Sequence, residues 1–263
     1  MSPNTYTPII IVFIFVHLYC LTLLTSSQYD SIECIPSERE ALLRFKHHLI
    51  EPLNRLSSWN VSNPNCCQWD YVVCSNVTSH VFQLHLNTSR DAFYYHGYLN
   101  SVAFGRSMFS GEINDSVVEL KHLNYLNLSG NDFGGHLTNQ LEMFKNLESL
   151  SLFNNLITGE IPQSLAKLQS LRYMTLTKNQ LSGNPFKTLG LFPKLLSLSI
   201  DDNLFQGIVQ EDDLVNFTAL RVLQVSGNNF TLKVHPSWQQ KFQLIVLRMN
   251  SWKLGPSFPS WIQ

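Results

Sequence analysis

A short pattern of leucines recurs along the C-terminal half of the chain. Written in one-letter form it is L-x-x-L-x-L-x-x-N, and its copies begin at Leu123, Leu147, Leu171, Leu195 and Leu220. The interval is 24 residues, except for 25 between the last two. Apolar residues that alternate with a period of two lie on one face of a strand. The pattern therefore predicts a row of short strands, one per copy.

Such strands cannot bury their leucines alone, so successive copies must stack and share one continuous core. A repeat of this length and pattern indicates a leucine-rich repeat array. The asparagine that ends each copy can both donate and accept hydrogen bonds, and we expect these asparagines to form a ladder along one edge of the strand row. A sixth copy starts at Leu244 and carries Trp252 where the asparagine is expected.

A second pattern follows the first in each copy. Its clearest instance is Leu156–Pro162, which reads L-x-x-G-x-I-P and resembles the plant-type leucine-rich repeat. The resemblance implies an α/β solenoid, a right-handed superhelix with a second small strand in each coil. Residues 184–186, 208–210 and 231–233 match the pattern poorly, so we expect this second sheet to be ragged. Glycines recur at the same interval: Gly111, Gly135, Gly159, Gly183 and Gly207.

A helix is predicted ahead of the array. Ser37 and Glu40 have the spacing of a capping box. Leu42, Phe45 and Leu49 fall on one helical face. Proline at position 52 should end the helix, because it cannot continue the hydrogen-bonding pattern.

Four cysteines lie near this helix, at Cys34, Cys66, Cys67 and Cys74. Their even number favours disulfides if the chain is secreted. Zinc is the alternative, although the adjacent pair fits poorly with the gaps of structural zinc sites.

The segment from Cys34 to Cys74, with its helix and two tryptophans, resembles the N-terminal cap of plant extracellular leucine-rich repeat proteins. These include receptor-like proteins, receptor-like kinases and polygalacturonase-inhibiting proteins. The resemblance implies that Cys34 pairs with Cys66 and Cys67 with Cys74, and that the cap covers the open end of the first coil. Tyr71 stands where this cap usually has glycine.

The chain divides into four predicted regions. Residues 1–27 contain the apolar run Ile9–Leu24 and read as a cleaved secretory signal peptide. An uncleaved anchor is the alternative, because no lysine or arginine precedes the apolar run. Residues 28–79 form the cap, 80–119 a first repeat with an aromatic insertion, and 120–263 the remaining repeats, which stop without a second cap. We expect the last coil to expose an aggregation-prone edge.

The insertion is predicted from spacing. Val81, Leu84 and Leu86 resemble the first strand of the array, and Leu126 follows Leu84 after 18 residues more than one period. Residues 91–105 are rich in aromatic side chains. They form either a ligand-binding loop or a degenerate coil.

Glycosylation sequons are frequent, as expected for surface positions of a secreted protein. A glycan on Asn127, between two strand leucines, would shield part of the strand face. The sequons begin at Asn60, Asn76, Asn87, Asn114, Asn127, Asn216 and Asn229.

Composition and motifs narrow the function. The net charge of −1 argues against nucleic acid as a partner, because its binding needs an excess of basic residues. No nucleophile, phosphate-binding or metal-binding motif of an enzyme occurs in the sequence. We therefore expect a binding protein without a cofactor or metal, and not an enzyme.

Binding should use the outward side chains of the strands. Aromatic and arginine side chains, which are enriched in interfaces, recur there at strand spacing, next to two aspartates. We expect a peptide, glycan or protein ligand, with a co-receptor kinase as a further partner. The predicted ligand-binding residues are Phe153, Arg172, Tyr173, Lys178, Asp201, Asp202 and Arg221.

Two functions fit such a face. The first is the extracellular recognition module of a plant receptor-like protein, at the plasma membrane or in the cell wall. The second is a soluble inhibitor of a cell-wall hydrolase such as polygalacturonase. The last residues, from Trp238 to Trp261, resemble the middle repeats of large receptor-like proteins rather than an inhibitor's cysteine-bearing C-terminal cap. We therefore favour the receptor.

Overall fold

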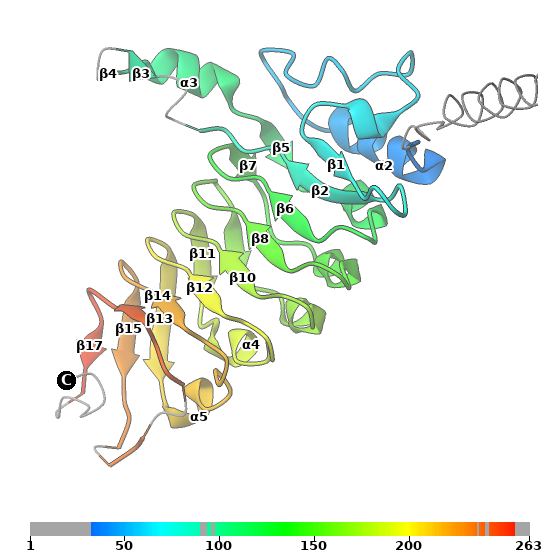
Figure 1. Ribbon diagram of the computed structural model, residues 1–263. Coiled ribbons are helices and arrows are strands. Elements are labelled where there is room, and N and C mark those ends of the chain that lie inside the picture. Colours follow the sequence, from blue (N-terminus) through cyan, green and yellow to red (C-terminus); the bar gives the residue numbers. More distant parts are fainter. Residues whose placement is uncertain (1–32, 90–93, 96–97, 236, 240–241, 256–263) are drawn as a thin grey trace, which may run out of the picture. The chain divides into compact units, whose positions relative to one another are not determined.

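The computed structural model describes residues 33–89, 94–95, 98–235, 237–239 and 242–255. Residues Cys34–Gln263 form one compact unit (Figure 1). The predicted signal peptide, residues 1–27, lies outside the described residues. In the part that is described, no helix is long and apolar enough to cross a membrane.

The predicted strand row is an eight-stranded sheet with the order β1-β2-β6-β8-β10-β12-β14-β16. All neighbours pair in parallel except β1 and β2, which are antiparallel. The middle residue of each strand from β6 to β14 is a leucine or methionine buried in the core. The strands are β1 (Val72–Cys74), β2 (Val81–His85), β6 (Tyr125–Asn127), β8 (Ser149–Ser151), β10 (Tyr173–Thr175), β12 (Ser197–Ser199), β14 (Val222–Gln224) and β16 (Val246–Arg248).

A second sheet of five strands has the order β17-β15-β13-β11-β9. The expectation that this sheet is ragged is correct at residues 184–186, because β11 ends at Gly183 and pairs with β13 over only two residues. It was wrong at 208–209 and 231–232, where β13 and β15 pair over four residues and Phe205 and Phe230 are buried in the core. A further break lies at β5 and β7, which form a separate pair. The strands are β5 (Ser110–Glu112), β7 (Asp132–Gly134), β9 (Thr158–Glu160), β11 (Gln180–Gly183), β13 (Leu204–Val209), β15 (Asn229–Leu232) and β17 (Lys253–Leu254).

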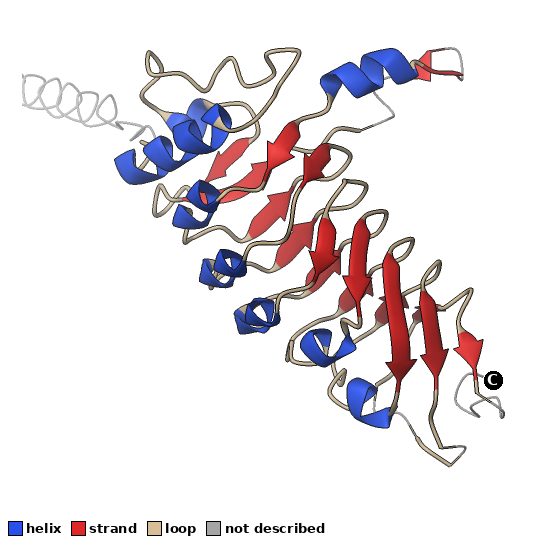
Figure 2. Cartoon of the chain, turned by 180° about the vertical axis from the view of Figure 1, so that it is seen from behind, coloured by secondary structure: helices blue, strands red, loops and turns tan. Residues whose placement is uncertain are grey.

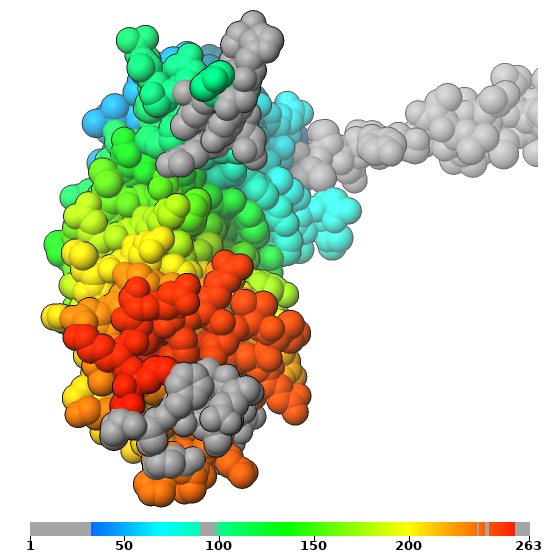
Figure 3. Space-filling view, turned by 90° about the vertical axis from the view of Figure 1, so that its left-hand side faces the viewer, coloured from blue at the N-terminus to red at the C-terminus, as the bar shows by residue number. Residues whose placement is uncertain are grey.

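Short helices complete the coils on the side away from the main sheet (Figure 2). At the start of η3 the side chain of Asn114 accepts a hydrogen bond from Ser116 N, and at the start of η4 the side chain of Thr138 accepts one from Gln140 N. Coils stack in sequence order, so the colours in Figure 3 run from green through yellow to orange and red. The helices are η3 (Asp115–Glu119), η4 (Asn139–Met143), η5 (Gln163–Lys167), α4 (Phe186–Leu189) and α5 (Glu211–Leu214).

The predicted asparagine ladder is confirmed. Each asparagine is buried and joins two coils, as Asn179 shows. Its Nδ2 donates to Leu152 O at 2.8 Å and Leu176 O at 2.9 Å, and its Oδ1 accepts from Ile157 N at 3.1 Å. The same arrangement occurs at Asn131, Asn155, Asn203 and Asn228.

Trp252 takes over part of this role in the sixth coil. Its Nε1 donates to Val225 O at 3.0 Å, across to the previous coil as a ladder asparagine does. Its ring packs against Phe230, with centroids 4.8 Å apart, and against Phe186 at 5.7 Å. The substitution therefore exchanges part of a hydrogen-bond ladder for an aromatic cluster.

The predicted cap helix is α2 (Pro36–His47), with Ala41, Leu42 and Phe45 buried. The capping box was wrong: the N-cap is Ile35, and no side chain caps it. Proline is favourable at the first helical position, so the helix starts one residue before Ser37. It also ends at His47, ahead of Pro52, because the backbone turns at His48.

Glu38 joins this helix to the sheet. Its carboxylate is buried and accepts from Val81 N at 2.7 Å and from His80 Nδ1 at 2.9 Å. A buried carboxylate must be hydrogen-bonded to be tolerated. Glu38 therefore fixes α2 at the start of β2.

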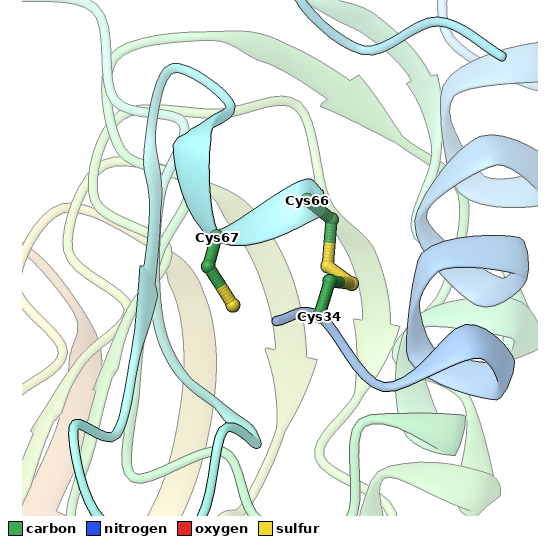
Figure 4. A group of neighbouring side chains, drawn as sticks. All are labelled: Cys34, Cys66 and Cys67. Carbon is green, nitrogen blue, oxygen red and sulfur yellow. A yellow bond between two sulfur atoms is a disulfide. The ribbon is translucent and has the colours of Figure 1, made fainter. Parts of the chain in front are cut away.

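The cysteine pairing is confirmed. Cys34 is bonded to Cys66, with Cα atoms 5.1 Å apart, and Cys67 to Cys74, with Cα atoms 5.4 Å apart. Cys66 and Cys67 both lie on η1 (Cys66–Gln68), and Figure 4 shows the bond from Cys66 to Cys34. All four sulfurs are used in disulfides, which removes the thiolates that the zinc alternative requires.

Strand β2 pairs directly with β6, so the sheet holds no strand of a further coil between them. The intervening chain instead forms a two-stranded pair and a helix, which project beside the first coils in Figure 1. Only residues 94–95 and 98–105 of the aromatic stretch are described. The elements are β3 (Tyr94–Tyr95), β4 (Tyr98–Leu99) and α3 (Ser101–Ser107).

Arg55 ties this insertion to the cap and the first coil. Its guanidinium donates to Thr88 Oγ1 at 2.6 Å, Ser107 O at 2.8 Å and Asn87 O at 3.0 Å. It also lies over the Phe109 ring, 4.2 Å from the centroid. One side chain therefore holds the end of α3 against the array.

We expect Arg55→Met to lower the free energy of unfolding by about 2 kcal/mol, because partly buried hydrogen bonds from a charged group are lost. Amide hydrogen exchange in α3 should accelerate, as read by mass spectrometry. Arg44→Met is the matched control, since Arg44 only forms an exposed ion pair with Glu119. Equal exchange in both variants would contradict the assigned role of Arg55.

Candidate ligand-binding face

The centre of the strand face is a floor of small hydroxyl side chains around one tyrosine. Tyr173 on β10 is 49% exposed. Register places it between Ser149 of β8 and Ser197 of β12. In the next row of outward side chains, Thr175 likewise lies between two serines. A ligand can therefore approach the backbone closely here, with hydroxyl groups available as donors and acceptors.

Two arginines lie at the N-terminal end of these strands. Arg172 directly precedes β10, and its Nε is 3.6 Å from Glu148 Oε2. Arg221 directly precedes β14 and donates from Nη1 to Gln243 O at 3.0 Å. Both side chains are exposed. Glu148 therefore offsets part of the charge of Arg172, whereas Arg221 adds a positive charge to this edge of the face.

The opposite end carries the other predicted residues. Phe153 is 38% exposed, and Lys178 Nζ lies 5.7 Å from its ring centroid. Asp201 is engaged in the fold, because its Oδ1 accepts from Ser226 N at 2.8 Å. Asp202 is exposed beside it. This end therefore combines an aromatic ring with both signs of charge.

The predicted residues do not form one cluster. The strands separate Arg172 and Arg221 from Phe153, Lys178 and the aspartates by roughly 15 Å, at about 3.3 Å per residue. Tyr173 and the hydroxyl floor lie between the two ends. A ligand that contacts all of them must extend along the strand direction.

The N-terminal flank of the face carries the sequon at Asn127. Its Nδ2, the atom that a glycan would modify, donates to Tyr125 OH at 3.1 Å. The Tyr125 ring stacks on His85 at 4.7 Å. Burial lowers the pKa of His85 below its usual value, which favours a neutral ring.

The sequons differ in exposure, and their occupancy stays a prediction. Asn60, Asn76, Asn216 and Asn229 are exposed, whereas Asn87 and Asn127 are half-buried. At Asn114 the amide nitrogen is buried and has no hydrogen-bond partner among the described residues, while the oxygen caps η3.

One feature of this face was missed in the sequence. A hollow of about 320 Å³ lies at the C-terminal edge of the strands, and Phe153 and Lys178 are among its lining residues. Phe104 of α3 lines it too, so the insertion contributes to its wall. Aligning the repeats at the residue before each ladder asparagine would have revealed the unusual lysine there.

Comparison with protein families gives two matches. Residues 35–75 match the family described as "Leucine rich repeat N-terminal domain". Residues 122–144 and 146–168 match the family described as "Leucine Rich Repeat". The chain has the fold of a plant-type leucine-rich repeat protein, with a matching N-terminal cap domain.

Curated relatives of this leucine-rich repeat protein include tomato (Solanum lycopersicum) "Receptor-like protein EIX2". It is 33% identical over 130 residues, 49% of this chain and 12% of that protein. "Polygalacturonase inhibitor 1" of rice (Oryza sativa subsp. japonica) is 41% identical over 44 residues, 17% of this chain and 13% of the inhibitor. The chain thus spans only about an eighth of the length of these curated relatives.

Solved structures share the fold. The complex of the Arabidopsis receptor kinase HAESA with the peptide hormone IDA and the co-receptor SERK1 gives a TM-score of 0.69 at 27% identity. The match covers 82% of this chain and 34% of the other. The BIR3–SERK2 complex from Arabidopsis thaliana gives 0.58 at 27% identity, covering 77% and 96%. The leucine-rich repeat array is therefore of the type found in plant receptor ectodomains.

Proposed function

We propose that this protein is the extracellular recognition module of a plant receptor-like protein, acting in defence or developmental signalling. The observation that carries the proposal is the strand face, where Tyr173 rises from a hydroxyl floor between Arg172 and Phe153. Aromatic and arginine side chains on a floor of small residues suit a ligand that lies flat on the sheet. The ligand class is a peptide, glycan or protein.

The setting follows from the relatives. Curated relatives are receptor-like proteins, and the HAESA complex contains a peptide hormone and a co-receptor. We infer the same setting for this chain, namely the secretory pathway and the outer face of the plasma membrane or the cell wall. A co-receptor kinase would be a second partner. The role is binding, without a catalytic step or cofactor.

A peptide selection tests the face. Peptides selected from a random displayed library on the wild-type protein are titrated against Tyr173→Ala and Arg172→Ala. We expect each variant to lose about 2 kcal/mol of binding free energy, roughly thirtyfold in Kd, because each removes a central anchor.

Gln163→Ala on η5 is the matched control, since its exposed side chain lies on the helix side. Circular dichroism should show that all three variants fold. Both face variants binding as tightly as the wild type would reject the strand face, and the insertion that contains α3 would become the next candidate.

Inhibition of a cell-wall hydrolase is the second candidate function. The 41% identity to the rice polygalacturonase inhibitor over 44 residues favours it. Titrating the protein into a fungal polygalacturonase assay separates the two functions. Stoichiometric loss of hydrolase activity would support the inhibitor, whereas unchanged activity would leave the receptor module.

A further inference from the structure

The residue before each ladder asparagine has a left-handed backbone. Lys178 occupies this position in the third full coil, with φ at 58°. The other coils place residues there that are small or can bond to their own backbone, which lowers the cost of this conformation. They are Gly130 (71°), Asn154 (55°), Asp202 (52°), Gly227 (68°) and Ser251 (74°). Lysine is the exception.

A long side chain in this region adds backbone strain that asparagine or glycine would reduce. Strain of this kind is typically retained where a side chain is used. The ammonium lies 5.7 Å from the Phe153 ring centroid, but an exposed contact of this type is weak. Stability alone therefore gives little reason for lysine here.

The Lys178 ammonium has no anionic partner among the described residues. Two aspartates of the next coil are engaged by other groups. Asp201 accepts from Ser226 N through Oδ1 and from Thr177 Oγ1, at 3.4 Å, through Oδ2. Asp202 Oδ1 packs so closely on Gly227 that an added Cβ there would lie 2.3 Å away. Among the described residues, neither carboxylate forms an ion pair with Lys178.

The hollow beside Lys178 suits a small anionic group. None of its described lining residues is acidic, and Lys178 is the one cation among them. Asn154 lines it, and its side-chain amide can donate a hydrogen bond. Phe153 and Phe104 form an apolar side. A charged hydrogen bond from lysine to a carboxylate is stronger than a neutral one.

We propose that Lys178 and this hollow form a subsite for a carboxylate of a peptide ligand, from an acidic side chain or a free C-terminus. The inference rests on the proposed function and adds a chemical requirement to it. Lys178 supplies the charge, the Asn154 amide supplies a directional donor, and Phe153 packs against the carbon chain that carries the carboxylate.

The subsite is tested by nuclear magnetic resonance on the glycosylated protein, with its lysines labelled by carbon-13 dimethylation. Dimethylation keeps the positive charge of lysine. The probes are acetyl-Gly-Asp-Gly-amide for a side-chain carboxylate, acetyl-triglycine for a terminal one, and acetyl-Gly-Asn-Gly-amide as the neutral match. We expect the Lys178 signal to shift saturably with at least one acidic probe and not with the neutral one. The acidic probe that binds identifies the source of the carboxylate.

Three variants complete the test. Lys178→Asn should weaken binding of the acidic probe at least tenfold and raise Tm by about 2 °C, because backbone strain is relieved. Lys178→Arg should retain binding. Lys145→Asn is the control, because Lys145 is exposed and remote from the hollow. The subsite would be rejected if the Lys178 signal shifted no more than the Lys145 signal. It would also be rejected if Lys178→Asn bound the acidic probe as tightly as the wild type.

The two proposals fail separately. If the acidic probes do not bind but Tyr173→Ala still weakens the selected peptides, only the carboxylate subsite is rejected. If the probes bind but the face variants behave as the wild type, the subsite remains and the strand-face function is rejected.

Discussion

Asn179→Ala should lower the free energy of unfolding by about 3 kcal/mol. The substitution leaves Ile157 N, inside the coil stack, without its acceptor. It also removes one of the two amide donors to Leu152 O and to Leu176 O, which keep their bonds from Asn155 and Asn203. Each buried backbone group that loses its hydrogen bond costs about 1–3 kcal/mol. The small void left by the side chain adds to this, since the site lies between two packed coils.

Chemical denaturation followed by circular dichroism measures the effect. Asn146→Ala is the matched control, because Asn146 is exposed and makes one long hydrogen bond, 3.3 Å, to Lys121 O. We expect the control to change stability by less than about 0.5 kcal/mol. A loss below about 1 kcal/mol at Asn179 would mean that water replaces the amide, and the ladder would not be a main source of stability.

Removing the disulfides should have the second large effect. Cys34→Ser with Cys66→Ser opens a loop of 32 residues, and we expect a loss of about 3–4 kcal/mol. Opening the Cys67–Cys74 loop of 7 residues should cost about 2–3 kcal/mol, because a shorter loop restricts the unfolded chain less. The cap should then detach from β2 before the rest of the array unfolds.

Hydrogen exchange in α2 and in β10 separates cap opening from global unfolding. In the Cys34–Cys66 variant, exchange in α2 should rise more than exchange in β10. Equal increases at both places would show that the cap and the array unfold as one unit. A larger stability loss on opening the shorter loop would contradict the chain-entropy account.

Periodicity explains why so much of the fold could be predicted. Strand leucines such as Leu126 and Leu150, and ladder asparagines such as Asn155, recur at a nearly constant interval. One local rule, applied to every coil, therefore specifies the strands, the core and the ladder. The cysteine pairing was implied by the resemblance of the cap, and the structure confirms it. Local rules were less reliable at the helix start, where Pro36 rather than Ser37 opens α2.

The binding site was only partly predictable. Outward positions such as Tyr173 and Arg172 follow from the strand period, because alternate side chains face opposite sides. Their separation from Phe153 and Lys178 follows from strand direction, and the hollow depends on α3, which no repeat pattern describes.

The sequence by itself therefore determined the strand, the ladder asparagine, the second strand and the order of stacking of the coils, since these depend on interactions between neighbouring repeats. Tertiary structure alone decided the exceptions. Trp252 replaces a ladder asparagine by reaching Val225 O, and Arg55 joins three distant segments. Lys178 forms no ion pair among the described residues, since Asp201 instead accepts from Thr177 Oγ1 and Ser226 N. Each of these depends on contacts between residues far apart in sequence, and such contacts leave no periodic pattern to recognise.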